Sequence, residues 1–205
     1  MKLLGFFFTL CCVEAALLSQ ALAADARNPD WPCVQPKVPQ MSIAAMWDGP
    51  SIADVGNSWQ EDPKIKDLVA RLAARRTPLD SAEKSIAEFL TGSAAEKQDK
   101  AKKLFAGLFD SSNAQRGEVM DGIERTARRQ KELADKVRSD VAALREMEDK
   151  SDQDQSKIAA LASEVEWSTR IFEDRRKTLR YVCEVPTAIE QRVFALARSI
   201  RQSLD

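Results

Sequence analysis

Two long runs of apolar positions dominate the second half of the chain. Apolar and small residues recur every three or four positions over residues 120–144, and the same spacing returns over residues 158–182. This spacing is typical of helices that pack together along a seam. A polar segment, residues 148–155, separates the two runs. The pattern predicts a long antiparallel helical hairpin with coiled-coil-like packing, whose seam is weakened by polar residues such as Gln130 and Arg175.

Shorter amphipathic segments come before the hairpin. Residues 62–63, Asp-Pro, and residues 77–78, Thr-Pro, are start signals for two helices. Ser93 and Glu96 form a capping box for a third. Each signal is followed by apolar residues that repeat on one helical face, so we expect three short helices that each bury one side.

Two interruptions divide the helical pattern further. The polar stretch 110–113 breaks the apolar repeat, so we expect the third short helix to end there and the first long helix to begin near Ala114. Pro186 lacks a backbone N–H and is expected to break or kink the second long helix. A last amphipathic helix over residues 189–204 follows this break.

The N-terminal part of the chain has a different composition. Residues 24–61 contain a cluster of four prolines, Pro29, Pro32, Pro36 and Pro39. Each proline pushes the preceding residue toward extended backbone, which predicts a proline-rich extended strap followed by a turn. We expect Trp47 and Trp59 to pack the strap onto a helical domain of residues 62–205. The predicted fold class is therefore all-α.

Residues 1–23 have the order of a secretory signal peptide. Lys2 precedes a dense apolar run, and the run ends in Ala21-Leu22-Ala23, a small-x-small cleavage signal. We expect cleavage between Ala23 and Ala24 and a periplasmic or secreted mature chain without a stable membrane span. Because Glu14 interrupts the apolar run, an uncleaved N-terminal anchor is the alternative.

Cleavage would leave two of the four cysteines. Cys11 and Cys12 lie inside the predicted signal peptide, where no small residue precedes either as a lipid-attachment signal requires. Cys33 and Cys183 remain, and an even pair in an oxidising compartment predicts one disulfide. Two free thiols, or a bridge between two chains, are the alternatives.

Composition narrows the chemistry. The chain has 31 Lys and Arg against 32 Asp and Glu, so no net field draws nucleic acid or an anionic membrane. It has no histidine, which removes Ser-His-Asp and Cys-His catalysis and the commonest metal ligand. No glycine-rich phosphate loop is present. We therefore predict no catalytic residue, no metal ligand and no cofactor.

Two further candidate metal-binding segments do not have the residue spacing that a metal site requires. The acidic stretch from Asp149 to Asp154 resembles a calcium loop, but a loop that starts at Asp152 would place Lys157 and Ser163 where glycine and glutamate are needed. We expect this stretch to be the solvated tip of the hairpin. Soft ligands at Cys33, Met41 and Met46 follow no copper-binding spacing, and a disulfide with packing methionines explains them.

Arginines cluster twice along the predicted hairpin, at residues 125–129 and residues 175–180. Such clusters bind phosphate or carboxylate when they converge. Glu124, Glu173 and Asp174 lie among them, so solvated helix faces with ion pairs are the expected arrangement.

Two stretches carry a family resemblance. Residues 30–39, with Asp-Trp-Pro-Cys-Val-Gln at their start, and residues 171–198, which include Tyr-Val-Cys-Glu-Val-Pro, resemble a family of small exported bacterial helical proteins without an assigned activity. The resemblance implies an envelope location and the pairing of Cys33 with Cys183. It implies no substrate and no catalytic residue.

Three functions follow as hypotheses. The first is a non-enzymatic interaction or structural protein of the envelope, which binds other envelope proteins or a second copy through its helices. The second is a holdase-type periplasmic chaperone that cradles unfolded clients. The third, from another class, is a metal-binding protein or an enzyme that uses carboxylates.

Overall fold

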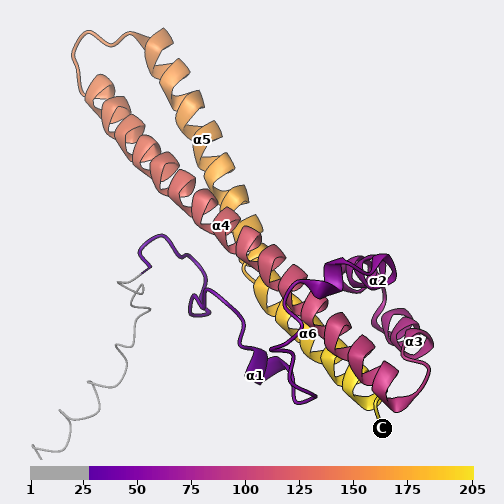
Figure 1. Ribbon diagram of the computed structural model, residues 1–205. Helices are drawn as coiled ribbons and strands as arrows, with labels where there is room; N and C mark the ends of the chain where they lie inside the picture. The colour runs from indigo at the N-terminus through magenta and orange to yellow at the C-terminus, as the bar shows by residue number, and fades with distance from the viewer. Residues whose placement is uncertain (1–27) are drawn as a thin grey trace, which may run out of the picture.

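The structure, a computed structural model, describes residues 28–205 and divides into a base and a projecting arm (Figure 1). The described elements are α1 (Ile43–Met46), η2 (Ser58–Gln60), α2 (Pro63–Ala73), α3 (Leu79–Phe89), α4 (Ala94–Glu148), α5 (Gln155–Val182) and α6 (Val185–Gln202). The fold is all-α, as predicted, and residues 28–205 include no strand. We define the arm as residues 124–182, and the base as the other described residues.

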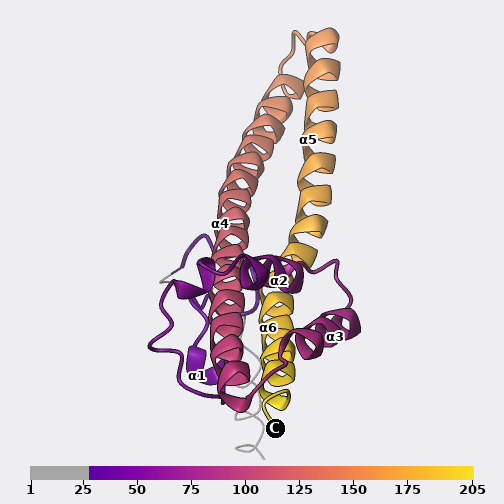
Figure 2. The ribbon, with the colours of Figure 1, turned by 45° about the vertical axis from the view of Figure 1, so that its right-hand side comes forward.

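Helix α4 is the element that joins the two regions. Its first half lies in the base against α2 and α6, and its second half pairs with α5 in the arm (Figures 1 and 2). The predicted capping box is present, because the Ser93 hydroxyl accepts from the Glu96 N–H while the Glu96 carboxylate accepts from the Ser93 N–H. The helix then continues for 55 residues.

The predicted break at residues 110–113 is wrong. Asp110 accepts a hydrogen bond from the Trp59 indole at 3.1 Å, and Asn113 accepts one from the Met41 N–H at 3.0 Å. Ser112 is buried in the helix. The polar residues therefore serve as docking points for the N-terminal segment rather than as helix terminators, and the long helix begins at Ala94 instead of near Ala114.

The other helix boundaries lie close to those predicted, although α6 begins at Val185 rather than at residue 189. Asp62 caps α2 by accepting from the Lys64 and Ile65 N–H groups. The hairpin turns at residues 149–154, and α5 ends before α6 begins with Pro186 in its first turn. At this position proline loses no intrahelical hydrogen bond, which is why it starts a helix here while ending the previous one.

The core lies in the base. The most buried apolar face of α4, residues 101–109, packs against α2, α6 and the two tryptophans of the N-terminal segment. Phe105 is fully buried and stacks on Trp47 with ring centroids 4.3 Å apart. Trp59 crosses α4 so closely at Gly107 that a β-carbon there would lie 2.7 Å from the indole. Both tryptophans thus pack as expected.

The strap runs along α4 in the antiparallel direction and is anchored at several points. Arg116 is buried; it donates to Glu190 on α6 at 2.6 Å and to the Val38 carbonyl at 2.7 Å. Lys37 pairs with Glu124 further along the helix. The buried guanidinium therefore joins α4, α6 and the strap through charge-assisted hydrogen bonds.

Candidate functional site: the helical arm

The arm differs from the base in how little of it is buried. Only Ala127, Gln130 and Ser168 are buried among its residues, all of which the structure describes. The apolar seam between its helices is half-buried along its length, at Leu133, Val137, Val141, Leu144 and Met147 of α4 and at Ile158, Leu161, Val165, Ile171 and Phe172 of α5. Two helices alone therefore leave the seam partly open to solvent.

Polar contacts supplement this open seam. The Gln130 amide donates to the Phe172 carbonyl at 3.0 Å across the two helices. Further out, Lys136 donates to Asp140 at 2.6 Å on its own helix and to Glu164 at 2.7 Å on the facing helix. These hydrogen bonds, Asp140 first and Glu164 second, raise the pKa of Lys136. The arm is thus held by an ion network as well as by apolar contact.

Two large aromatic side chains project from α5. Trp167 is 61% exposed and Tyr181 is 74% exposed, whereas the base buries Trp47 and Trp59. They are fourteen residues apart, about four helical turns, so they share one face of α5. That face lies opposite the three-four repeat of the seam, and within residues 28–205 α4 is the helix that packs along α5 (Figures 1 and 2). The sequence interpretation missed both residues, although their positions outside the three-four repeat were a usable signal.

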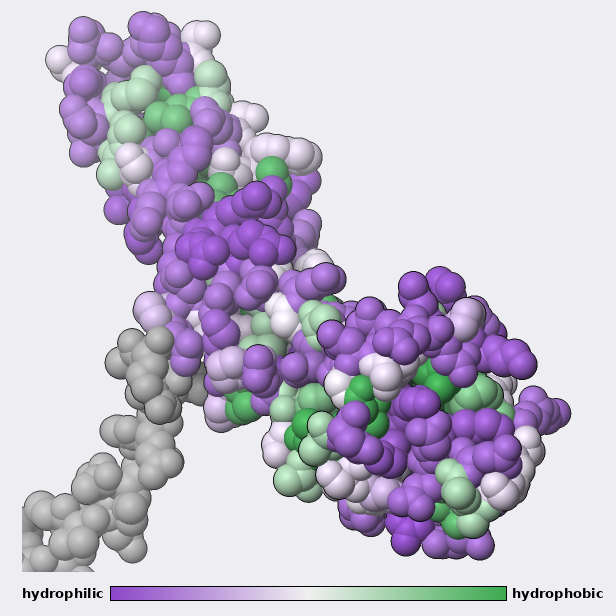
Figure 3. Space-filling view, in the orientation of Figure 1, coloured by the Kyte–Doolittle hydropathy of each residue, from purple (hydrophilic) through white to green (hydrophobic). Residues whose placement is uncertain are grey.

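The two ends of the arm carry net charges of opposite sign. The distal part, residues 135–166, has nine Asp and Glu against five Lys and Arg. The root, residues 124–134 and 167–180, has nine Lys and Arg against four Asp and Glu. Figure 3 shows the resulting mostly hydrophilic surface, interrupted by apolar patches toward the tip. An arm with opposite charge at its two ends favours partners with the reverse arrangement.

The predicted disulfide is present where the arm meets the base. Cys33 of the strap and Cys183, directly after α5, are bonded with their Cα atoms 5.5 Å apart. Beside this bond a cavity of about 290 Å³ separates the strap from the arm root, with Trp31, Phe172 and Leu179 in its lining. The disulfide therefore fixes the strap over the root of the arm.

The remaining predicted site positions have structural roles or lie outside the described residues. The cleavage position between Ala23 and Ala24 lies outside them. Asp154 caps α5 by accepting from the Ser156 and Lys157 N–H groups, and its hydrogen bonds, first that from the Lys157 side chain, lower its pKa. No group of three or more potential metal ligands comes together in residues 28–205.

The arginine clusters pair with acidic neighbours. Arg128 lies 3.4 Å from Asp30 of the strap, and Arg176 lies 2.8 Å from Glu173 on its own helix. Lys131 donates to Asp30 at 2.8 Å, and this hydrogen bond is the largest of the interactions that lower the pKa of Asp30. One arginine of each cluster is thus engaged in an ion pair, as expected for solvated helix faces.

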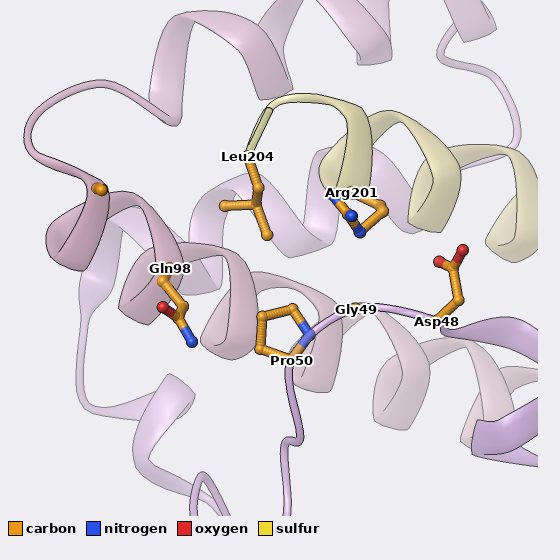
Figure 4. A pocket seen from close by; sticks show the side chains of 7 residues that line it. Asp48, Gly49, Pro50, Gln98, Arg201 and Leu204 are labelled. Atoms are coloured by element: carbon orange, nitrogen blue, oxygen red, sulfur yellow. The ribbon is translucent and has the colours of Figure 1, made fainter.

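A second cavity, of about 360 Å³, opens at the end of the base (Figure 4). Asp48 and Gln98 line it together with Arg201 and Leu204 near the C-terminus. Arg201 is already paired with Asp205 at 2.7 Å, and this bond raises its pKa, with a smaller contribution from Asp48. Its lining residues include no nucleophile paired with a base.

These features define the class of protein: an all-helical base that carries a two-helix arm with an open seam and exposed aromatics. No family model, no curated protein and no solved structure matches the chain. Within residues 28–205, no helix is both long enough and apolar enough to cross a membrane.

Proposed function

We propose that this chain is an exported, non-enzymatic helical protein of the cell envelope that binds another protein through its arm. The observation that carries the proposal is the exposure of Trp167 and Tyr181 on a face of α5 that no helix of residues 28–205 covers. Exposed aromatics are enriched where proteins bind one another, because they bury a large area with few rotatable bonds.

Two features support the export part of the proposal. The first 23 residues have the order of a signal peptide, and the Cys33–Cys183 bond suits an oxidising compartment. N-terminal sequencing of the chain recovered from the periplasm tests it. A chain that begins at Ala24 supports export with cleavage, and a chain that retains Met1 contradicts cleavage.

A photo-crosslinking amino acid tests the binding part. Placed at Ser163, on the exposed face of α5, it is expected to give one discrete covalent adduct in envelope preparations. The matched control places the same group at Lys84, which is also exposed but lies on α3 in the base. Adducts from both positions, or from neither, would contradict a binding role for the arm.

The half-open seam also favours a second candidate, a holdase-type chaperone. Partly exposed apolar positions along two helices offer an unfolded chain a continuous surface to contact. Suppression of aggregation of a reduced model protein is the measurement. No effect at a molar excess of the purified chain would contradict this candidate.

A further inference from the structure

The outer face of α5 is a stripe of mainly small and aromatic residues. The exposed positions that share the face of Trp167 are Ser156, Ala160, Ser163, Thr178 and Tyr181, with one carboxylate, Asp174, among them. Helix α5 has 28 residues and is about 42 Å long, so the stripe extends along most of a straight helix. Small residues let a second helix approach closely, and the two aromatics provide apolar area to bury.

The charges of the arm indicate which partner fits this stripe. The acidic distal part and the basic root lie at opposite ends of the same hairpin. In an antiparallel pair, the basic root of each copy lies beside the acidic distal part of the other copy. A parallel copy would place like charges together at both ends, which is unfavourable.

We propose that two copies of this chain associate through the outer faces of their α5 helices, antiparallel and about a two-fold axis close to Trp167. This inference rests on the proposed binding role of the arm and names its partner. Trp167 lies near the midpoint of α5, so in this arrangement it meets the Trp167 of the second copy. The ends then pair by charge, and the centre by aromatic contact.

Engineered cysteines test the geometry directly. Ser156 and Thr178 each lie eleven residues from Trp167, on the same face and in opposite directions. The antiparallel dimer therefore places Ser156 of one copy beside Thr178 of the other. The native cysteines of the mature chain are already bonded, so new thiols report only on new contacts.

We expect a crosslinked dimer only when the two cysteine variants are mixed. Purified S156C and T178C chains, mixed and mildly oxidised, should give a disulfide-linked dimer that contains one of each, because facing residues meet the distance a disulfide requires. S156C alone should give little dimer. Efficient crosslinking of S156C to itself would indicate a parallel pair and overturn the proposal.

Sedimentation equilibrium of the unmodified mature chain provides the second measurement. We expect a dimer whose Kd rises at least tenfold between 50 mM and 1 M salt, because salt screens the charge pairing of exposed groups. Trp167→Glu should also raise the Kd at least tenfold. The control is Phe194→Glu, since Phe194 is an exposed aromatic of the base that lies outside the proposed interface.

The outcomes separate this inference from the proposed function. A chain that remains monomeric at both salt concentrations, while Ser163 crosslinks to a different envelope protein, overturns the dimer and leaves the binding role of the arm. A monomer that gives no adduct from the arm overturns both. A dimer that persists unchanged in Trp167→Glu also overturns the proposed interface.

Discussion

Helix α4 passes through both the base and the arm, and its side chains are buried to very different extents in the two regions. In the base, Leu104 and Leu108 are fully buried among residues from α2, α6 and the N-terminal segment. In the arm, Leu144 of the same helix is only half-buried against α5. The base is therefore stabilised by a closed core, while the arm retains apolar surface that a partner can cover.

The Cys33–Cys183 bond lies at the boundary between these regions, and its removal should have the largest effect. It closes a loop with a sequence separation of 150 residues, which in the chain-entropy model stabilises the fold by about 5 kcal/mol. We expect the double variant with Cys33→Ser and Cys183→Ser to unfold at a much lower urea concentration, as followed by circular dichroism.

The reduced unmodified chain provides the control for this variant, because it lacks the bond but keeps the cysteines. In both forms the strap should detach from the arm root, and both forms should remain helical without denaturant. If the oxidised chain and the double variant unfold at the same urea concentration, the disulfide does not contribute as argued.

Two leucines of α4 give a matched comparison of base and arm. Leu104→Ala removes a fully buried side chain from the core and should reduce the free energy of unfolding by about 2–5 kcal/mol. Leu144→Ala, on the same helix with the same chemistry, should cost about 1 kcal/mol because its site is already partly hydrated. Urea denaturation at low protein concentration measures both.

Protein concentration sharpens this comparison. The proposed dimer covers the outer face of α5 and leaves the seam open, so the costs of Leu144→Ala and of Leu104→Ala should both stay the same at concentrations where the dimer forms. A cost of Leu144→Ala that increases with dimer formation would place the second copy over the seam instead. Equal losses for the two variants at low concentration would show that the arm has a closed core of its own.

Local signals in the sequence predicted most of the helices, since their causes lie within a few residues. The Asp62 cap, the box of Ser93 and Glu96 and the break at Pro186 are all of this kind. Residues 110–113 were misinterpreted because their hydrogen-bond partners, Met41 and Trp59, lie more than fifty positions away. A local pattern contains no information on such partners.

The candidate site was predictable only in outline. The three-four repeat indicated the hairpin and its weak seam, but a repeat shows which residues face inward and not whether anything covers the others. The exposure of Trp167 follows from the arrangement of the described helices, in which only α4 packs along α5, and this is a property of the whole fold. The division of charge along the arm could have been counted from the sequence once the hairpin was recognised.

The smallest expected effect concerns the ionic attachment of the strap to the arm root. The pKa of Asp30 is lowered in the folded chain, mainly by the hydrogen bond from Lys131 and also by Arg128, against the cost of desolvation. A carboxyl group with a lowered folded-state pKa contributes stability above its ordinary pKa, about 3.9, and loses it as pH falls through the lower value. The contribution of an exposed pair is small.

Asp30→Asn isolates this contribution. At pH 6 the variant should unfold at a slightly lower urea concentration than the unmodified chain, and the difference should shrink as the pH falls below the ordinary pKa of an aspartate and the folded carboxyl becomes protonated. Urea titrations of both chains over a series of pH values from 6 downward measure it. A difference that stays unchanged over this series would mean that Asp30 acts through packing of the strap, so the arm root would be held by contact rather than by charge.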